Sequence, residues 1–335
     1  MPFQFNQEQI CPNCPLGFCV EDRRNNPVPG RNTKFRFQQH AAVACCFDSF
    51  IPGTDNDPNP SRSFKEYLTQ FGDNSERAGQ ILFGQESDLN HQAVAKVTGD
   101  VFELLAAAAM WNAAAVWNQF MDTGVWNSTA FTRPEGSMDA PGRKVAIVPL
   151  PRGYDATKLF HEAARKSISA HEQALKICDM ELGLSAPDIV GVRIPEPCPP
   201  EFQKFLQPLT NLGSIGREHV EDGYKSIEGK LDGRSFLFAI AMKRSIRSDR
   251  LYQPLFEANV LKYLISEVLR GSALRFFAYF GNIEGANAEA HYRAATLVSL
   301  MRGGKFERAV DKLYVALNPR DTAQEILNEL PRYAL

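Results

Sequence analysis

The pattern of apolar and polar residues along the chain predicts buried strands separated by helices. Residues 236–242, FLFAIAM, are apolar throughout and too few to cross a membrane, which is typical of a strand buried on both faces. Apolar runs rich in β-branched or aromatic residues predict further strands at 144–150, 186–192 and 273–280. Residues 90–120 have a helical pattern that is apolar almost all round, so we expect a buried helix there.

The remaining periodic stretches predict amphipathic helices, and the segments rich in Gly, Pro, Ser and Asn predict loops at 52–62 and 123–142. One helix is expected over 155–182 and another from about 251 to 270. After residue 285 we expect three helices, broken at Gly303–Gly304 and Asn318–Pro319.

Composition is that of an ordinary globular chain, with 335 residues, 44% hydrophobic, 23% charged and a net charge of −2. No signal pattern and no run of about 18 apolar residues occurs, so we expect a cytoplasmic location. The net charge argues against a non-specific nucleic-acid coat protein. Lys and Arg cluster at 23–24, 31–36 and 243–250, which indicates one confined cationic cleft. Solvated surface is the alternative for the first two clusters.

Seven cysteines without an export signal argue against a disulfide framework. Cys11, Cys14 and Cys19 have the spacing that begins a zinc site, but a fourth ligand is missing unless His40, Cys45 or Cys46 folds back. Reduced, partly buried thiols are the favoured interpretation, and structural zinc stays open.

The end of the predicted strand at 236–242 carries the main candidate chemistry. Lys243 and three arginines, Arg244, Arg247 and Arg250, follow it with a single acid among them, Asp249. Arginine suits the O6 and N7 acceptors of guanine, and a carboxylate accepts from the N4 amino group of cytosine. The cluster therefore favours phosphate chemistry beside base reading.

Glu103 is a second candidate, because it lies within the apolar helix predicted at 90–120. An ionised carboxylate there is costly unless a cation or hydrogen-bond donors meet it. A partner arginine in the core is the structural alternative to a catalytic role.

The order of these residues resembles the CCGG family of type II restriction endonucleases. Lys243, the run Arg247-Ser248-Asp249-Arg250 and Glu257, fourteen positions after the lysine, are similar to its K-x-x-x-R-S-D-R-…-E signature. Pro187–Asp188 opens a strand about fifty residues earlier, as in PD-(D/E)xK nucleases. Ala241 stands where the second acid usually lies, and the CCGG family supplies that acid from the next helix, where Glu257 is found. The resemblance is strong over about a third of the chain.

The resemblance implies an α/β PD-(D/E)xK restriction-endonuclease-like fold with a central mixed sheet flanked by helices. It also implies Mg²⁺-dependent double-strand cuts in DNA, at a palindrome containing CCGG or split CC/GG halves, which leave 5′ overhangs with 5′-phosphates. The active form would be a homodimer or a higher oligomer in the bacterial cytoplasm. Residues 1–40 would form an arm, and 41–335 one catalytic and recognition domain with its core at 94–281 and C-terminal helices at 284–330.

The family also implies the role of each site residue. Asp188, Glu257 and Glu103 would hold one or two Mg²⁺ ions, and Lys243 would orient or help deprotonate the attacking water. The residues expected to contact DNA are the C·G readers Arg247, Asp249 and Arg250 and, by position, the flanking contacts Lys96 and Arg31.

Three other functions compete with this one. A structure-directed DNA repair nuclease of the same fold would cut at no fixed sequence. A catalytically silent sequence-specific DNA-binding regulator would show no Mg²⁺-dependent digestion, and an unrelated metabolic enzyme would require the shared blocks to be accidental.

Overall fold

The structure of the chain is a computed structural model, and it describes residues 19–21, 34–37, 43, 46–83, 88–89, 91–137, 141–183, 185–245, 251–283, 288–302 and 306–333. Within these ranges, none of the helices combines the length and the apolar character that crossing a membrane requires.

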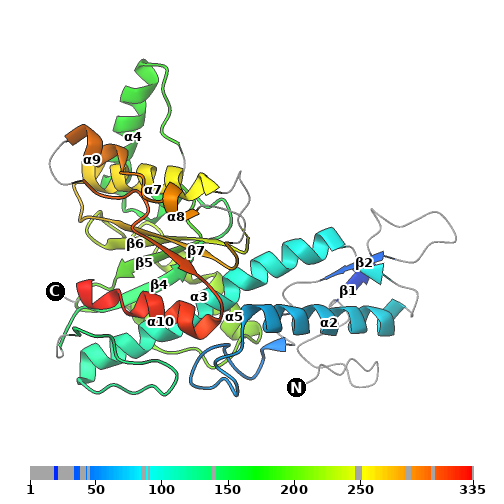
Figure 1. Cartoon of the computed structure of the whole chain (residues 1–335). Coiled ribbons are helices and arrows are strands. Elements are labelled where there is room, and N and C mark those ends of the chain that lie inside the picture. The colour runs from blue at the N-terminus through cyan, green and yellow to red at the C-terminus, as the bar shows by residue number, and fades with distance from the viewer. Residues whose placement is uncertain are drawn as a thin grey trace.

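A central sheet of five strands runs through the molecule (Figure 1). In spatial order its strands are β4 (Val145–Pro149), β5 (Ile189–Arg193), β6 (Phe236–Lys243), β7 (Arg275–Phe280) and β8 (Lys312–Val315). The pairs β4–β5 and β5–β6 are antiparallel, whereas β6–β7 and β7–β8 are parallel. The sheet is therefore mixed, and the expected α/β class with a mixed sheet flanked by helices is confirmed.

Helices cover both faces of the sheet (Figure 1). The two longest are α2 (Phe64–Phe83) and α3 (His91–Thr123). The others are η1 (Ala156–Leu159), α4 (Glu162–Ile177), η2 (Pro200–Leu206), α5 (Ser214–Glu221), η3 (Gly223–Ser226), α7 (Gln253–Tyr263), the π-turn η4 (Leu264–Val268), α8 (Ala288–His291), α9 (Leu297–Arg302), α10 (Pro319–Leu327) and η5 (Leu330–Tyr333). Helices α3 and α10 pack against each other on one side of the sheet, and α4 and α7 lie on the other.

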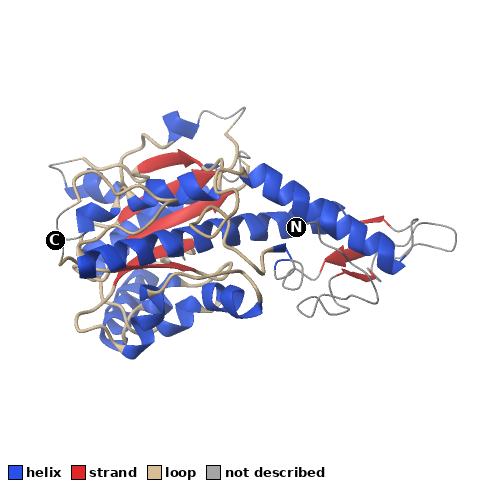
Figure 2. Cartoon of the chain, turned by 90° about the horizontal axis from the view of Figure 1, so that it is seen from below, coloured by secondary structure: helices blue, strands red, loops and turns tan. Residues whose placement is uncertain are grey.

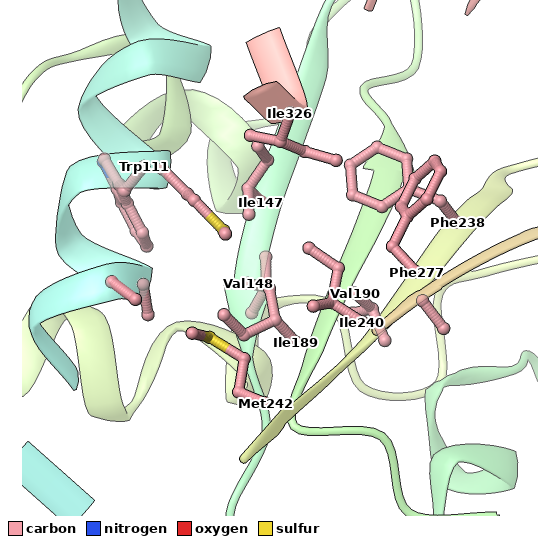
Figure 3. Close-up of a cluster of buried hydrophobic side chains, with 14 of the residues drawn as sticks. Trp111, Ile147, Val148, Ile189, Val190, Phe238, Ile240, Met242, Phe277 and Ile326 are labelled. Atoms are coloured by element: carbon pink, nitrogen blue, oxygen red, sulfur yellow. The ribbon is translucent and has the colours of Figure 1, made fainter. Parts of the chain in front are cut away.

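The core lies between the sheet and helices α3 and α10 (Figure 3). Trp111 of α3 and Ile326 of α10 pack with strand residues such as Ile147 and Phe238. All but the last residue of β6 are buried, as its apolar sequence predicts. Helix α3 is buried almost continuously from Val101 onward, so the prediction of a buried helix is confirmed.

Two asparagines of α3 bond to neighbouring backbone instead of to solvent. Asn118 Nδ2 donates to the Val145 carbonyl (2.9 Å), and its Oδ1 accepts from the Val145 N–H (2.8 Å). Asn112 makes the equivalent pair of bonds to Leu209 (2.9 and 2.8 Å). Buried polar groups need such partners. The bonds of Asn118 hold α3 against the edge strand β4, and those of Asn112 hold it against the segment after η2.

A second, small sheet contains β1 (Cys19–Glu21), β2 (Lys34–Phe37) and β3 (Asp88–Leu89). Strand β1 pairs antiparallel with β2, and β2 pairs parallel with β3. Figure 2 shows this sheet at the far end of α2 and α3, away from the central sheet. The division into an arm at 1–40 and one domain at 41–335 stays a prediction.

Two expectations about the elements are wrong. The segment after Gly303–Gly304, expected as a helix, contains β8, because pairing with β7 at the edge of the sheet stabilises an extended backbone there. The helix expected over 155–182 is divided into η1 and α4. Between them Phe160 forms a bridge with Leu231, and the ring of His161 accepts from the Ala164 N–H as the N-cap of α4.

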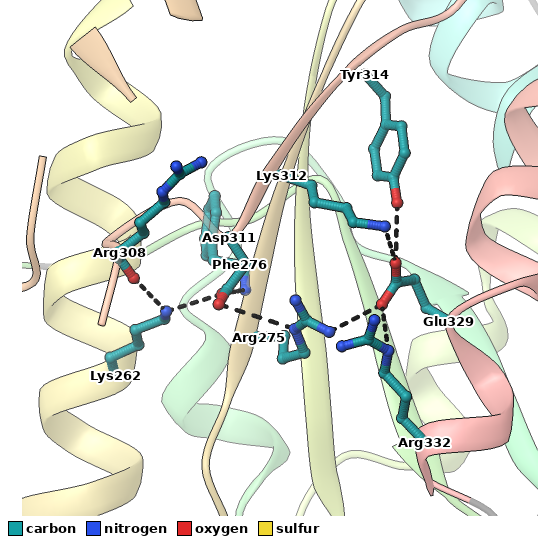
Figure 4. A network of polar contacts seen from close by, with 9 residues as sticks. All are labelled: Lys262, Arg275, Phe276, Arg308, Asp311, Lys312, Tyr314, Glu329 and Arg332. Carbon is teal, nitrogen blue, oxygen red and sulfur yellow. Dashed lines mark hydrogen bonds and ion pairs between the residues drawn. The ribbon is translucent and has the colours of Figure 1, made fainter. Parts of the chain in front are cut away.

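A buried carboxylate joins the C-terminal turn to the sheet (Figure 4). The Glu329 side chain is 2% exposed and contacts Arg275 of β7 (2.9 Å), Lys312 of β8 and Arg332 of η5 (3.2 Å). Its Oε1 also accepts from the Tyr314 hydroxyl (3.2 Å). Burial alone would raise the pKa of Glu329, but these cations outweigh burial and lower it.

Candidate active site

Asp188 and Lys243 meet because β5 and β6 are antiparallel neighbours. The start of β5 then lies beside the end of β6, and the Asp188 N–H donates to the Ile240 carbonyl (3.0 Å). Asp188 Oδ2 accepts from the backbone N–H of Met242 (2.6 Å) and from Lys243 Nζ (2.9 Å). The side chains of Lys243 and Asp188 are only 13% and 15% exposed.

Lys243 is surrounded by carboxylates. Burial disfavours its charged form, but Asp188, Glu103 and Glu257 outweigh burial and raise its pKa. The side chain is therefore a cation at neutral pH.

Glu103, in the middle of α3, lies within electrostatic range of this ion pair. Burial, and then the charge of Asp188, raises the pKa of Glu103 to about 8, while Lys243 and Arg152 act in the opposite direction. Arg152 is exposed, on the loop after β4. Glu103 thus lies in the electrostatic field of the Asp188–Lys243 pair.

Glu257 approaches from α7 and is 4% exposed. Gln253 donates from Nε2 to Glu257 Oε1 (2.7 Å), whereas the buried Oε2 has no hydrogen-bond partner in the described part of the chain. Burial raises the pKa of Glu257 to about 7, with Asp188 adding to the rise and Gln253 and Lys243 opposing it. Glu257 therefore interacts electrostatically with the same Asp188–Lys243 pair as Glu103.

These side chains fit a hard cation held by two carboxylates. Mg²⁺ usually keeps several waters and takes one or two carboxylates together with substrate phosphate oxygens. Asp188 and Glu257 act on one another, and Glu257 has a buried oxygen without a partner. Across the described ranges, no group of three or more His, Cys, Asp or Glu side chains lies close enough to hold one metal ion. The metal-binding role of Glu103 therefore stays a prediction.

The predicted base-contacting residues are not tested by this geometry. Arg247, Asp249, Arg250 and Arg31 lie outside the described residues, and for Lys96 only its backbone position in α3 is described. The candidate zinc ligands Cys11, Cys14, His40 and Cys45 also lie outside the described residues. For Cys19 only the backbone position in β1 is described, and Cys46 is half-buried.

Three interactions at the site were not anticipated from the sequence: Gln253 with Glu257, Arg244 with Thr98, and Arg152 with Glu103. Gln253 lies four positions before Glu257, the spacing at which side chains meet on one helix face. Arg244 donates to the hydroxyl of Thr98 and so ties the end of β6 to α3, the helix that carries Glu103. The spacing gave a signal for Gln253, but nothing in the sequence pairs Arg244 with Thr98 or Arg152 with Glu103.

Comparison with known proteins places the chain in a family. Two solved structures of a restriction endonuclease, Bse634I, share the fold at 18% sequence identity. One, of the type IIF enzyme with cognate DNA, has a TM-score of 0.71 and covers 94% of this chain and 98% of that chain. The other has a TM-score of 0.72 and covers 95% and 98%. No curated protein sequence matches significantly. The sequence model of the Cfr10I/Bse634I restriction endonucleases matches residues 60–330, and the chain therefore belongs to that restriction endonuclease family.

Proposed function

We propose that this protein is a type II restriction endonuclease that makes Mg²⁺-dependent double-strand cuts at a palindromic DNA site containing CCGG or split CC/GG halves. Cleavage would leave 5′ overhangs with 5′-phosphates. The single observation that carries the proposal is the Asp188–Lys243 ion pair at adjoining strand ends, with Glu257 and Glu103 acting on it, in a chain of this family.

Phosphodiester hydrolysis requires a positioned water and neutralisation of charge on the phosphate oxygens. Asp188 and Glu257 would hold Mg²⁺, with Glu103 completing its shell or fixing a water. The ion would polarise the phosphate and activate water when bound. The raised pKa of Lys243 supports a role as a fixed cation that orients the water and stabilises the phosphate, because a base would first have to lose its proton.

The segment that follows Lys243 would recognise the DNA bases. Arg247 and Arg250 would each donate two hydrogen bonds to a guanine, and Asp249 would accept from cytosine. The blocks 96–118 and 243–260 resemble the corresponding stretches of the CCGG-family enzyme SgrAI, which supports a CCGG-related target. Lys96 and Arg31 would contact flanking bases.

A palindrome has two equivalent half-sites, which a two-fold symmetric homodimer reads with the same residues twice. We therefore expect at least a dimer on double-stranded DNA, as part of a bacterial restriction-modification system in the cytoplasm. The structure of Bse634I with cognate DNA supports DNA as the substrate.

The deciding experiment is digestion of a plasmid of known sequence with and without Mg²⁺, followed by mapping of the cut ends. We expect cuts at one palindromic sequence, none without the ion, and none with Lys243→Ala or Asp188→Ala, while both variants still bind the site. Lys166→Ala is the matched control, because Lys166 is an exposed lysine on α4 that pairs with Glu162.

Other outcomes identify the competing functions. Cuts at no fixed sequence would indicate a structure-directed repair nuclease, and binding without any digestion would indicate a silent DNA-binding regulator. Full activity of Lys243→Ala or Asp188→Ala would remove the assigned catalytic roles.

A further inference from the structure

Gln253 is placed to control how Glu257 presents its carboxylate. It is the first residue of α7, one turn before Glu257, and it is exposed, whereas Glu257 is buried. Its side-chain amide donates to Glu257 Oε1 at 2.7 Å. An exposed amide thus holds one oxygen of a buried carboxylate.

The second oxygen of this carboxylate is the unusual feature. Glu257 Oε2 is buried and has no hydrogen-bond partner among the residues that the structure describes. Buried carboxylate oxygens are normally satisfied by a donor or a cation. Lys243, the nearby side-chain cation, already bonds to Asp188. Oε2 is therefore free to act as a ligand of a divalent cation.

The backbone of Glu257 is fixed independently of its side chain. Ser185 Oγ donates to the Glu257 carbonyl oxygen (3.4 Å), which places the loop before Asp188 against α7. The freedom that remains to Glu257 is rotation of its side chain, and the bond from Gln253 limits that rotation. A neutral amide does this without adding a charge that would neutralise the carboxylate.

We propose that Gln253 is a positioning residue for cation binding: its amide holds Oε1 of Glu257 so that Oε2 is presented to the cation. The inference rests on the proposed function, in which Asp188 and Glu257 hold Mg²⁺. Outer groups that orient a metal ligand typically change metal affinity by about 10–100-fold when removed.

The test measures the affinity of the full-length protein for Mn²⁺. The protein is added stepwise to Mn²⁺, and electron paramagnetic resonance follows the signal of the free ion, which decreases as the ion binds. Glu257→Ala should lose this binding site, and Gln253→Ala should weaken it by about 10–100-fold. Gln253→Met keeps the length of the side chain but lacks the donor, and should behave like Gln253→Ala. Gln173→Ala is the control, because Gln173 is an exposed glutamine on α4, and it should bind Mn²⁺ like the wild type.

Thermal melting distinguishes a positioning role from a role in folding. Gln253→Ala and Gln253→Met should have the melting temperature of the wild type, because position 253 is exposed. Wild-type Mn²⁺ affinity in Gln253→Ala and Gln253→Met, or in Glu257→Ala, would overturn the inference. If the wild-type protein then still cleaves DNA with Mg²⁺, the inference alone has failed. Absence of Mg²⁺-dependent cleavage by the wild type would instead reject the proposed function.

Discussion

A single oxygen of Asp188 accepts both from the backbone of β6 and from Lys243. The carboxylate is thereby fixed by the sheet itself, and not by the rotamer of a long side chain. Glu103 and Glu257 differ from it, because burial holds the pKa of each above its ordinary value. Both carboxyl groups therefore resist ionisation.

This gives a pH dependence of stability that can be measured in a chelator. A carboxyl whose pKa is raised on folding stabilises the fold fully below its unfolded pKa, and this contribution is lost as pH rises through the folded value. For Glu103 the loss extends from about pH 4.5 to about pH 8. Between these pH values we expect the melting temperature to fall more steeply with rising pH for the wild type than for Glu103→Gln, because glutamine cannot ionise.

Glu162→Gln is the control for that comparison, since Glu162 is an exposed residue of α4. It should follow the wild-type curve. A slope in Glu103→Gln as steep as that of the wild type would show that Glu103 ionises normally.

The proposed readers can be tested one residue at a time. Arg247→Ala or Arg250→Ala should cost about 1–3 kcal/mol of binding per lost bidentate contact and relax discrimination at one C·G pair. Competition binding with duplexes altered at single positions measures this. Arg165→Ala, an exposed arginine on α4, should leave discrimination unchanged, and unchanged discrimination in both reader variants would contradict the role.

The sequence could bring Asp188, Lys243 and Glu257 together because each lies near the end or start of a strongly patterned element. Neighbouring strand ends and the following helix then leave few possible arrangements. The bond from Gln253 to Glu257 was harder to foresee, because it depends on side-chain rotamers. The contact of Arg244 with Thr98 joins residues 146 positions apart in the chain, and local sequence patterns carry no information about such pairs.

At the scale of elements, β5 and β6 approach closely at a glycine. Gly191 pairs with Phe238, and a Cβ on Gly191 would lie 2.0 Å from the Cζ atom of that ring. The register of the pair also shifts between Gly191 and Val192. The absence of a side chain at 191 makes room for the phenylalanine over the strand.

Gly191→Ala should therefore destabilise the protein by about 1–3 kcal/mol, as expected for overpacking a buried site. Urea unfolding measures the change. Gly72→Ala is the control with the opposite expected effect. Gly72 lies inside α2, and apart from its own helix backbone and its chain neighbours no atom of the described residues comes within 4 Å of the added Cβ. This substitution should stabilise the protein by up to about 1 kcal/mol. Equal stabilities of Gly191→Ala and the wild type would mean that the ring of Phe238 moves aside freely.

The elements that pattern analysis predicted are those with long or uniform apolar runs. Strand β6, and helix α3 from Val101 onward, are buried almost throughout, which is why their apolar sequences predicted them. Strand β8 has four residues, all partly or fully exposed, and exists through its pairing with β7. Helix α2 was not predicted, although Ser63 and Glu66 form a capping box at its start, with Glu66 Oε2 accepting from the Ser63 N–H at 2.8 Å.

At the scale of the whole molecule, Glu329 connects the C-terminal turn to β7 and β8. Glu329→Ala would leave Arg275 and Lys312 without this carboxylate. We expect a loss of about 1–3 kcal/mol in unfolding free energy for a buried group left without its partner, together with faster proteolysis near residue 330. Glu289→Ala, which removes an exposed i,i+4 pair with Arg293, should change stability by no more than about 1 kcal/mol. Identical losses in the two variants would contradict a structural role for the buried network.

The bonds that Asn118 makes to Val145 have a consequence for how two copies of this protein could assemble. Unpaired backbone along an edge strand is a template on which another chain can add its own strand. At β4 the outward N–H and carbonyl of residue 145 are both occupied by the amide of α3, and Pro149 has no N–H to offer. Continuing the sheet into a neighbouring chain past residue 145 would break those bonds, so we expect the proposed dimer to form through other surfaces.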